Sequence, residues 1–145
     1  MTDDTLLYRG ISPALNRDEE GYVNTYVFMP TFKDNGLLSV FNGELVDAGE
    51  ALRRRRQLLM GQGRNSEDCY GICAVSLGEC RHQQLEEKPD LDASGPDDPH
   101  FFIDFKGLDG WIKKKKPPMS WKVAAALLAE YARNRSPSNN GVLCT

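Results

Sequence analysis

Short runs of β-branched and aromatic residues, separated by turn signals, are the feature that most restricts the fold of this 145-residue chain. Such residues favour extended structure. Pro13 and Pro30 follow the first two runs, and a proline cannot donate a hydrogen bond to a β ladder. The runs predict strands at residues 6–12, 22–29, 37–41, 69–77 and 100–105.

Two longer segments have the pattern of helices. Residues 46–63 begin with Asp47 as an N-cap and Glu50 as its capping-box partner. Residues 119–135 repeat apolar side chains at helical spacing. The order of strands and helices predicts an α+β fold: a mostly antiparallel sheet of about five strands, with the two main helices packed on one side. Residues 1–145 suit one domain with a single core.

Composition narrows the classes of function. The formal net charge of −3 argues against a nucleic-acid binder that relies on its total charge. No apolar run reaches the roughly 18 residues of a membrane span, and the acidic start lacks an export signal. Four cysteines in a chain of this length are not a disulfide scaffold. We therefore expect a cytoplasmic protein without membrane contact, and no motif predicts a cofactor.

Residues 81–99 are polar and acidic, and they are rich in proline, glycine and aspartate. The segment is long for a plain connection between two elements. We interpret it as a mobile or functional loop.

Arg9 lies between a hydrophobic run and a glycine, and two hypotheses account for it. The first is structural: Asp104, inside an apolar run, needs a positive partner if it is buried, and Arg9 is our first candidate. The second is functional. Tyr8-Arg9-Gly10 resembles the entry motif of ADP-ribosyltransferases, in which such an arginine lies near the phosphates of NAD. That resemblance implies an NAD-handling enzyme centred on Arg9 with His100 or Glu79, although the family's Ser-Thr-Ser strand and Glu-x-Glu turn are not found here.

Cys69, Cys73, Cys80 and His82 place four soft ligands close together in the sequence. Structural zinc sites use tight pairs of ligands, and only the first interval fits that spacing. On a straight strand Cys69 and Cys73 would be roughly 13 Å apart, which is too far for one metal ion. We predict small buried hydrophobic side chains and no metal site.

Two basic runs, Arg53-Arg54-Arg55-Arg56 and Lys113-Lys114-Lys115-Lys116, are the most visible charged features. Phosphate contacts from such runs would bind nucleic acid, which is one alternative function. An acidic partner protein is another ligand for the same charges. No nucleophile, base and orienting group fall into a recognised spacing. We therefore prefer a non-catalytic accessory domain that docks on another protein through opposite charges, and the enzyme of the previous hypothesis is the alternative.

The stretches YRGISPAL, FMPTFKDNGLLSVFNGE, GICAVSLGE and HFFIDFKGL together resemble a family of small, largely uncharacterised bacterial domain proteins. The resemblance implies a compact bacterial protein and a partner encoded nearby, in a system such as defence or toxin immunity. It implies no particular activity. The residues that carry the pattern are Arg9, Pro13, Phe28, Pro30, Asp34, Gly36, Leu38, Ser39, Val40, His100, Asp104 and Phe105. Besides the two basic runs, we take Arg9, Ser39, His100 and Asp104 as candidate binding residues.

Overall fold

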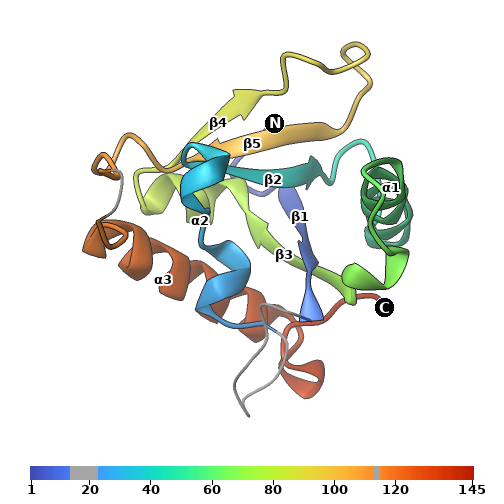
Figure 1. The fold of residues 1–145 in the computed structure, drawn as a ribbon. Coiled ribbons are helices and arrows are strands. Elements are labelled where there is room, and N and C mark those ends of the chain that lie inside the picture. Colours follow the sequence, from blue (N-terminus) through green and yellow to red (C-terminus); the bar gives the residue numbers. More distant parts are fainter. Residues whose placement is uncertain (14–22, 113–114) are drawn as a thin grey trace.

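A computed structural model describes residues 1–13, 23–112 and 115–145. In the described part, strands and α-helices alternate irregularly along the chain (Figure 1). The strands are β1 (Leu6–Ile11), β2 (Leu37–Asn42), β3 (Gly71–Ser76), β4 (Glu86–Pro89) and β5 (His100–Asp104). The α-helices are α1 (Ala48–Gly61), α2 (Leu77–His82) and α3 (Met119–Arg135), and short 3-10 helices cover Thr25–Phe28, Phe32–Asp34, Ser66–Asp68 and Pro137–Asn139.

The five strands form one antiparallel sheet in the order β3-β1-β2-β5-β4. The predicted α+β class, the five-stranded sheet and the two main helices are therefore confirmed. The strand predicted at residues 22–29 is wrong for its described part, because Thr25–Phe28 is a 3-10 helix. The Asn24 side chain accepts a hydrogen bond from the Tyr26 backbone N–H, and this cap turns the chain where an extended strand would continue.

The two main helices cover opposite faces of the sheet, so the prediction that both lie on one side is wrong (Figure 1). Alternate residues of a strand point to opposite faces. Tyr8, Phe41 and Ile72 pack with α1 through Leu52 and its neighbours. Their strand neighbours, such as Leu7 and Val40, pack with α3 in the larger core. The sequence signal for this arrangement is the run GICAVS of β3, which shows no alternation of apolar and charged residues. All six of its residues are buried, so the strand is covered on both faces.

Trp121 on α3 is the largest fully buried side chain of the larger core. Its indole N–H donates to the Asp109 backbone carbonyl at 2.8 Å. Its ring meets Phe105 and Trp111 edge to face, with centroids 5.8 and 5.6 Å away. This cluster fixes α3 against the Phe105 end of β5 and against the chain that precedes the helix.

Residues 81–99 contain more regular structure than a loop. His82 ends α2, and Glu86–Pro89 forms the edge strand β4, which pairs with β5. Residues 90–99 then return to β5 through turns, and the mobility of this part stays a prediction. In the described part of the chain, no helix has the length and apolar character needed to cross a membrane.

Candidate functional site

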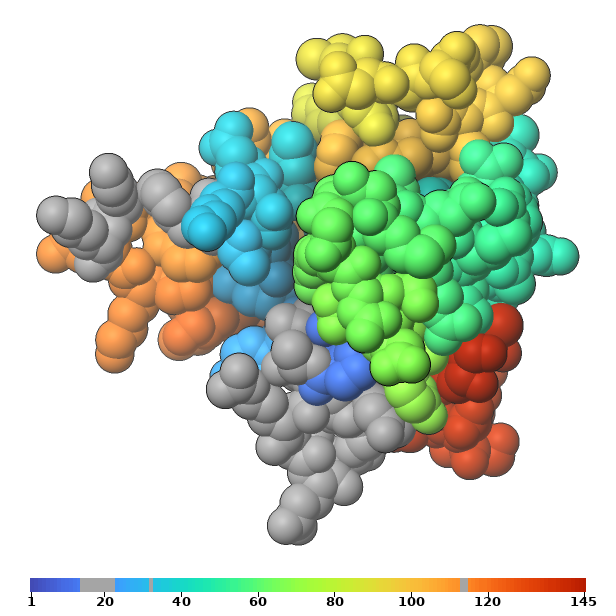
Figure 2. All heavy atoms as spheres, turned by 45° about the vertical axis from the view of Figure 1, so that its right-hand side comes forward, coloured from blue at the N-terminus to red at the C-terminus, as the bar shows by residue number. Residues whose placement is uncertain are grey.

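A pocket of about 760 Å³ lies between α1 and the sheet. Its walls are residues of β2 and β5, one side of α1, and the connection between β4 and β5. In Figure 2, α1 (green) and this connection (yellow) are neighbours on the face that is turned forward. The lining residues are Ser39, Phe41, Arg54, Arg55, Gln57, Leu58, Gly61, Gln62, Asp90, Asp92, Asp98, His100 and Phe102.

Strand alternation places Ser39 and His100 in this pocket. Ser39 pairs with Phe102 in the register of β2 and β5, and Phe41 pairs with His100. Ser39 and His100 are thus diagonal neighbours on the face that α1 covers, and such neighbours lie within reach of long or aromatic side chains. The residue that follows each of them on its strand, Val40 on β2 and Phe101 on β5, points into the core on the other face of the sheet.

Asp90 reaches the same place through the pairing of β4 with β5. The last paired residues are Pro89 and Phe101, so one further step of the antiparallel register sets Asp90 opposite His100. Pro89 ends the strand, and the chain turns after it. The Asp90 carboxylate therefore lies beside the histidine ring although ten residues separate the two in sequence.

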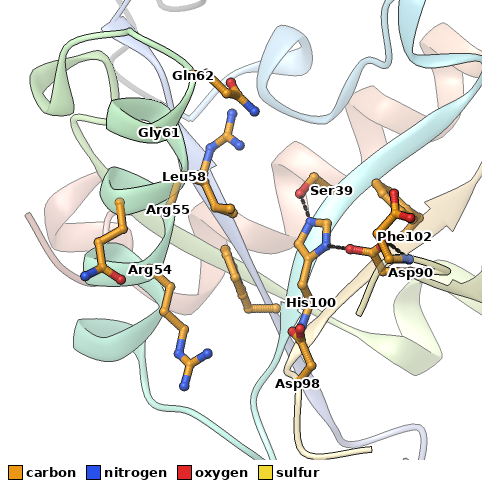
Figure 3. Close-up of a pocket in the computed structure, with 13 residues that line it drawn as sticks. Ser39, Arg54, Arg55, Leu58, Gly61, Gln62, Asp90, Asp98, His100 and Phe102 are labelled. Atoms are coloured by element: carbon orange, nitrogen blue, oxygen red, sulfur yellow. Dashed lines mark hydrogen bonds and ion pairs between the residues drawn. The ribbon is translucent and has the colours of Figure 1, made fainter. Parts of the chain in front are cut away.

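Ser39, His100 and Asp90 form one continuous chain of hydrogen bonds (Figure 3). The Ser39 Oγ lies 2.5 Å from His100 Nε2, and His100 Nδ1 lies 2.6 Å from Asp90 Oδ2. The hydrogen bond from His100 lowers the pKa of Asp90, which keeps the carboxylate ionised and able only to accept. Nδ1 of a neutral imidazole then carries the proton, and Nε2 accepts the hydroxyl proton of Ser39.

Neighbouring groups hold the His100 ring in this orientation. Phe102 meets the ring edge to face at 5.0 Å between centroids, and Phe41 lies at 5.5 Å. Asp98 accepts a hydrogen bond from the His100 backbone N–H, which lowers the pKa of the Asp98 carboxyl. The side chains of His100 and Asp90 are 16% and 19% exposed, so both are shielded from solvent but open to the pocket. The arrangement is that of a hydroxyl nucleophile, a base and a group that orients the base.

The four arginines of the first basic run do not form one patch. Arg53 and Arg54 both pair with Glu50, one turn earlier on α1. Arg56 donates to the backbone carbonyl of Cys69. Arg55 makes no hydrogen bond or ion pair with another residue that the structure describes. Consecutive residues of a helix point in different directions, and this separates their partners.

Arg9 does not pair with Asp104, so this prediction is wrong. The Arg9 guanidinium donates to the backbone carbonyls of Val27 at 2.9 Å and Ser39 at 3.0 Å. Asp104 instead accepts from the Lys106 backbone N–H. β2 lies between β1 and β5 in the sheet, and this separates the two side chains. Burial, and after it the charge of Arg55, lowers the pKa of Arg9 to about 10, so Arg9 is still a cation at neutral pH.

Arg9 connects β1 to β2 just beyond the last residues at which these two strands pair directly. β1 pairs with β2 at Leu7 and Tyr8, whereas it pairs with β3 along all six of its residues. We expect Arg9→Lys to lower the free energy of unfolding by about 1–3 kcal/mol, because an ammonium cannot reproduce the planar fork that reaches two carbonyls. Urea unfolding measures this change, and Arg53→Lys, at an exposed position, is the control. Equal stability of the two variants would show that the carbonyl contacts contribute little.

The other predicted site residues lie away from the pocket or outside the described residues. Glu79 completes the capping box of α2 and pairs with Arg135, and it is not among the lining residues of the pocket. Lys115 and Lys116 are exposed on the chain before α3. Lys113 and Lys114 lie outside the described residues.

The cysteines are free thiols in the structure. Burial raises the pKa values of Cys73 and Cys80 to about 12, so both are protonated at neutral pH. Among the described residues, no group of three or more His, Cys, Asp or Glu side chains is placed to hold a metal ion.

Of the candidates taken from the sequence, the pocket brings together Ser39, His100, Arg54 and Arg55. Arg9 is not among the lining residues, but its guanidinium donates to the backbone carbonyl of Ser39. Sequence reasoning missed Asp90. Its signal was a carboxylate directly after a strand-ending proline, but that signal is visible only once β4 is known to pair with β5. Comparison of the chain with protein-family models, with curated proteins and with solved structures finds no match.

Proposed function

We propose that the protein is a hydrolase that uses Ser39 as its nucleophile and acts on an ester. The observation that carries this proposal is the continuous hydrogen-bond chain Ser39–His100–Asp90 in the wall of an open pocket. A nucleophile, a base and an orienting carboxylate define such sites by their geometry and not by their order in the sequence. The base is in position to take the hydroxyl proton before any substrate binds.

The reaction follows from these contacts. Ser39 Oγ attacks the carbonyl carbon of the ester while its proton passes to His100 Nε2. The carbon–oxygen bond to the alcohol then breaks, and the imidazolium returns the proton to the departing alcohol oxygen. Water, deprotonated by His100, then attacks the carbonyl carbon of the acyl-serine. The bond to Ser39 Oγ breaks, the imidazolium returns its proton to Ser39 Oγ, and the acid is released. The Asp90 carboxylate holds the imidazole in its tautomer and stabilises the imidazolium during both steps.

Docking on a partner protein, the function preferred from the sequence, stays a prediction. Three of the four arginines in the first basic run are engaged within the protein, which reduces the charge available to a partner. The nucleic-acid alternative also stays a prediction, because half of the lysine run lies outside the described residues. The NAD-handling alternative, centred on Arg9 with His100 or Glu79, stays a prediction as well. Glu79 is engaged on α2, and the Arg9 guanidinium donates to the backbone carbonyls of Val27 and Ser39.

Hydrolysis of p-nitrophenyl esters of increasing acyl length tests the proposal. We expect the wild-type protein to release p-nitrophenol with saturation kinetics and Ser39→Ala to lose at least about 10³-fold in kcat/KM, because the nucleophile is removed. Ser138→Ala, at an exposed position outside the pocket lining, is the control and should keep its activity. Equal rates for wild type and Ser39→Ala across the whole series would refute a serine nucleophile.

A further inference from the structure

Arg55 brings a positive charge into the same pocket and makes no hydrogen bond or ion pair with any other residue that the structure describes. Its neighbours Arg53, Arg54 and Arg56 are engaged by Glu50 or by a backbone carbonyl, but Arg55 has no such partner among the described residues. Figure 3 shows its guanidinium on the Gln62 side of the pocket, whereas Arg54 extends toward the opposite end.

Gly10 sets the direction of the Arg55 side chain. A Cβ at Gly10 would lie 3.0 Å from Arg55 Cγ and 3.2 Å from Cys69 Sγ, so the carbon chain of Arg55 packs directly on the β1 backbone. The close contact leaves the guanidinium little freedom except to extend past the strand into the pocket. A guanidinium held in this way is prepared to bind a planar or tetrahedral anion through two hydrogen bonds.

The local charge balance favours a negative ligand at this end. Arg9 adds a second positive charge behind Ser39, and this charge lies close enough to Arg55 for the two cations to repel each other. The Asp90 and Asp98 carboxylates of the lining already accept hydrogen bonds from His100. The Asp34 carboxylate attracts both arginines, but it accepts hydrogen bonds from Thr31 and forms no ion pair with either of them. A partly buried cation without a direct ion pair is costly, and an anionic ligand would reduce that cost.

The remaining wall of the pocket is apolar. Phe41 and Phe102 lie on the sheet side and Leu58 on the α1 side, between the two arginines. These side chains suit a hydrocarbon or aromatic part of a ligand. Because Arg54 pairs with Glu50, the pocket offers the charge of Arg55, the Ser39 hydroxyl and one apolar surface to the same molecule.

Building on the hydrolase function proposed above, we propose that the substrate is an ester that also carries a phosphate or carboxylate group, and that Arg55 binds this group. The anionic group is a recognition element and is separate from the ester bond that Ser39 attacks. Phosphate and carboxylate share the chemistry that a guanidinium recognises, and the two are separated by the experiment.

Binding of unreactive probes to the Ser39→Ala protein tests this proposal without any catalytic step. Phenyl phosphate, benzoate and the neutral benzyl alcohol are titrated by isothermal calorimetry, with Arg55→Gln and the matched Arg53→Gln introduced into the same background. We expect Arg55→Gln to weaken the binding of at least one anionic probe by about tenfold or more, because a charge-assisted contact is lost, and Arg53→Gln to leave it unchanged. The probe that binds more tightly, phenyl phosphate or benzoate, identifies the anionic group.

Equal binding of benzyl alcohol and the anions, or equal binding by Arg55→Gln, would overturn the proposal, as would the absence of binding by both anions. Circular dichroism checks that Arg55→Gln folds. If it does not, the salt dependence of binding to the Ser39→Ala protein decides the matter: affinity that falls as sodium chloride rises supports an ion pair, and constant affinity contradicts it. Anion binding through Arg55 together with no ester hydrolysis by the wild type would refute the hydrolase and keep the anion site.

Discussion

Replacing Asp90 by asparagine should lower the kcat of ester hydrolysis by about 10³- to 10⁴-fold, although the pocket keeps its shape. The Asp90 carboxylate can only accept from His100 Nδ1, whereas an amide can donate to it. A donated hydrogen bond would move the imidazole proton to Nε2, and Nε2 could then no longer accept the Ser39 proton. The loss should appear in kcat with a small change in KM, because Asp90 contacts the base and not the substrate.

Asp97→Asn is the matched control for this substitution. Asp97 is an exposed aspartate of the same connection and lies outside the pocket lining. Initial rates of both variants on one p-nitrophenyl ester give the comparison, after the thermal unfolding midpoint has shown that both are folded. A kcat for Asp90→Asn within about threefold of wild type would mean that the hydrogen-bond chain only stabilises the fold, since an orienting carboxylate contributes far more.

Truncation of Trp121 to alanine should lower the free energy of unfolding by about 3–5 kcal/mol. The side chain is almost fully buried between Phe105 and Trp111, and its indole N–H is bonded to the Asp109 carbonyl. The substitution therefore leaves both a cavity and an unpaired carbonyl. This loss is a large part of the total stability of a domain of this size, so partial unfolding at room temperature is expected.

Met119→Ala, two residues earlier on α3, is the comparison for Trp121. Met119 is 68% exposed, so its truncation should change stability by no more than about 0.5 kcal/mol. Urea unfolding followed by far-UV circular dichroism measures both variants. A loss below about 1 kcal/mol for Trp121→Ala would contradict the packing of α3 against this end of the sheet.

The class of the fold could be predicted from the sequence because strand and helix periods are local signals. The runs at 6–12, 37–41, 69–77 and 100–105 all contain strands of the sheet. Which face each helix covers is not a local property, because it depends on how the strands are ordered in the sheet. The run at 69–77 has no polar alternation across β3, and this pattern is typical of a strand that is covered on both faces.

The site could be predicted only in part for the same reason. Ser39 and His100 stood out within apolar strands, and each lies in the pocket. Asp90 lay among several acidic residues of the 81–99 segment, and only the β4–β5 register distinguishes it from them. The sequence also could not distinguish Arg55 from the three arginines beside it. Their different surroundings follow only from the direction in which the helix points each side chain.

The most direct test of the account is covalent labelling with a fluorophosphonate, which reacts with a serine only when a base activates its hydroxyl. We expect one adduct on the wild-type protein, located on Ser39 by peptide mass spectrometry, with none on Ser39→Ala and much slower labelling of Asp90→Asn. An unlabelled wild-type protein, or an adduct on any other residue while Ser39 stays free, would contradict the assignment of Ser39 as an activated nucleophile.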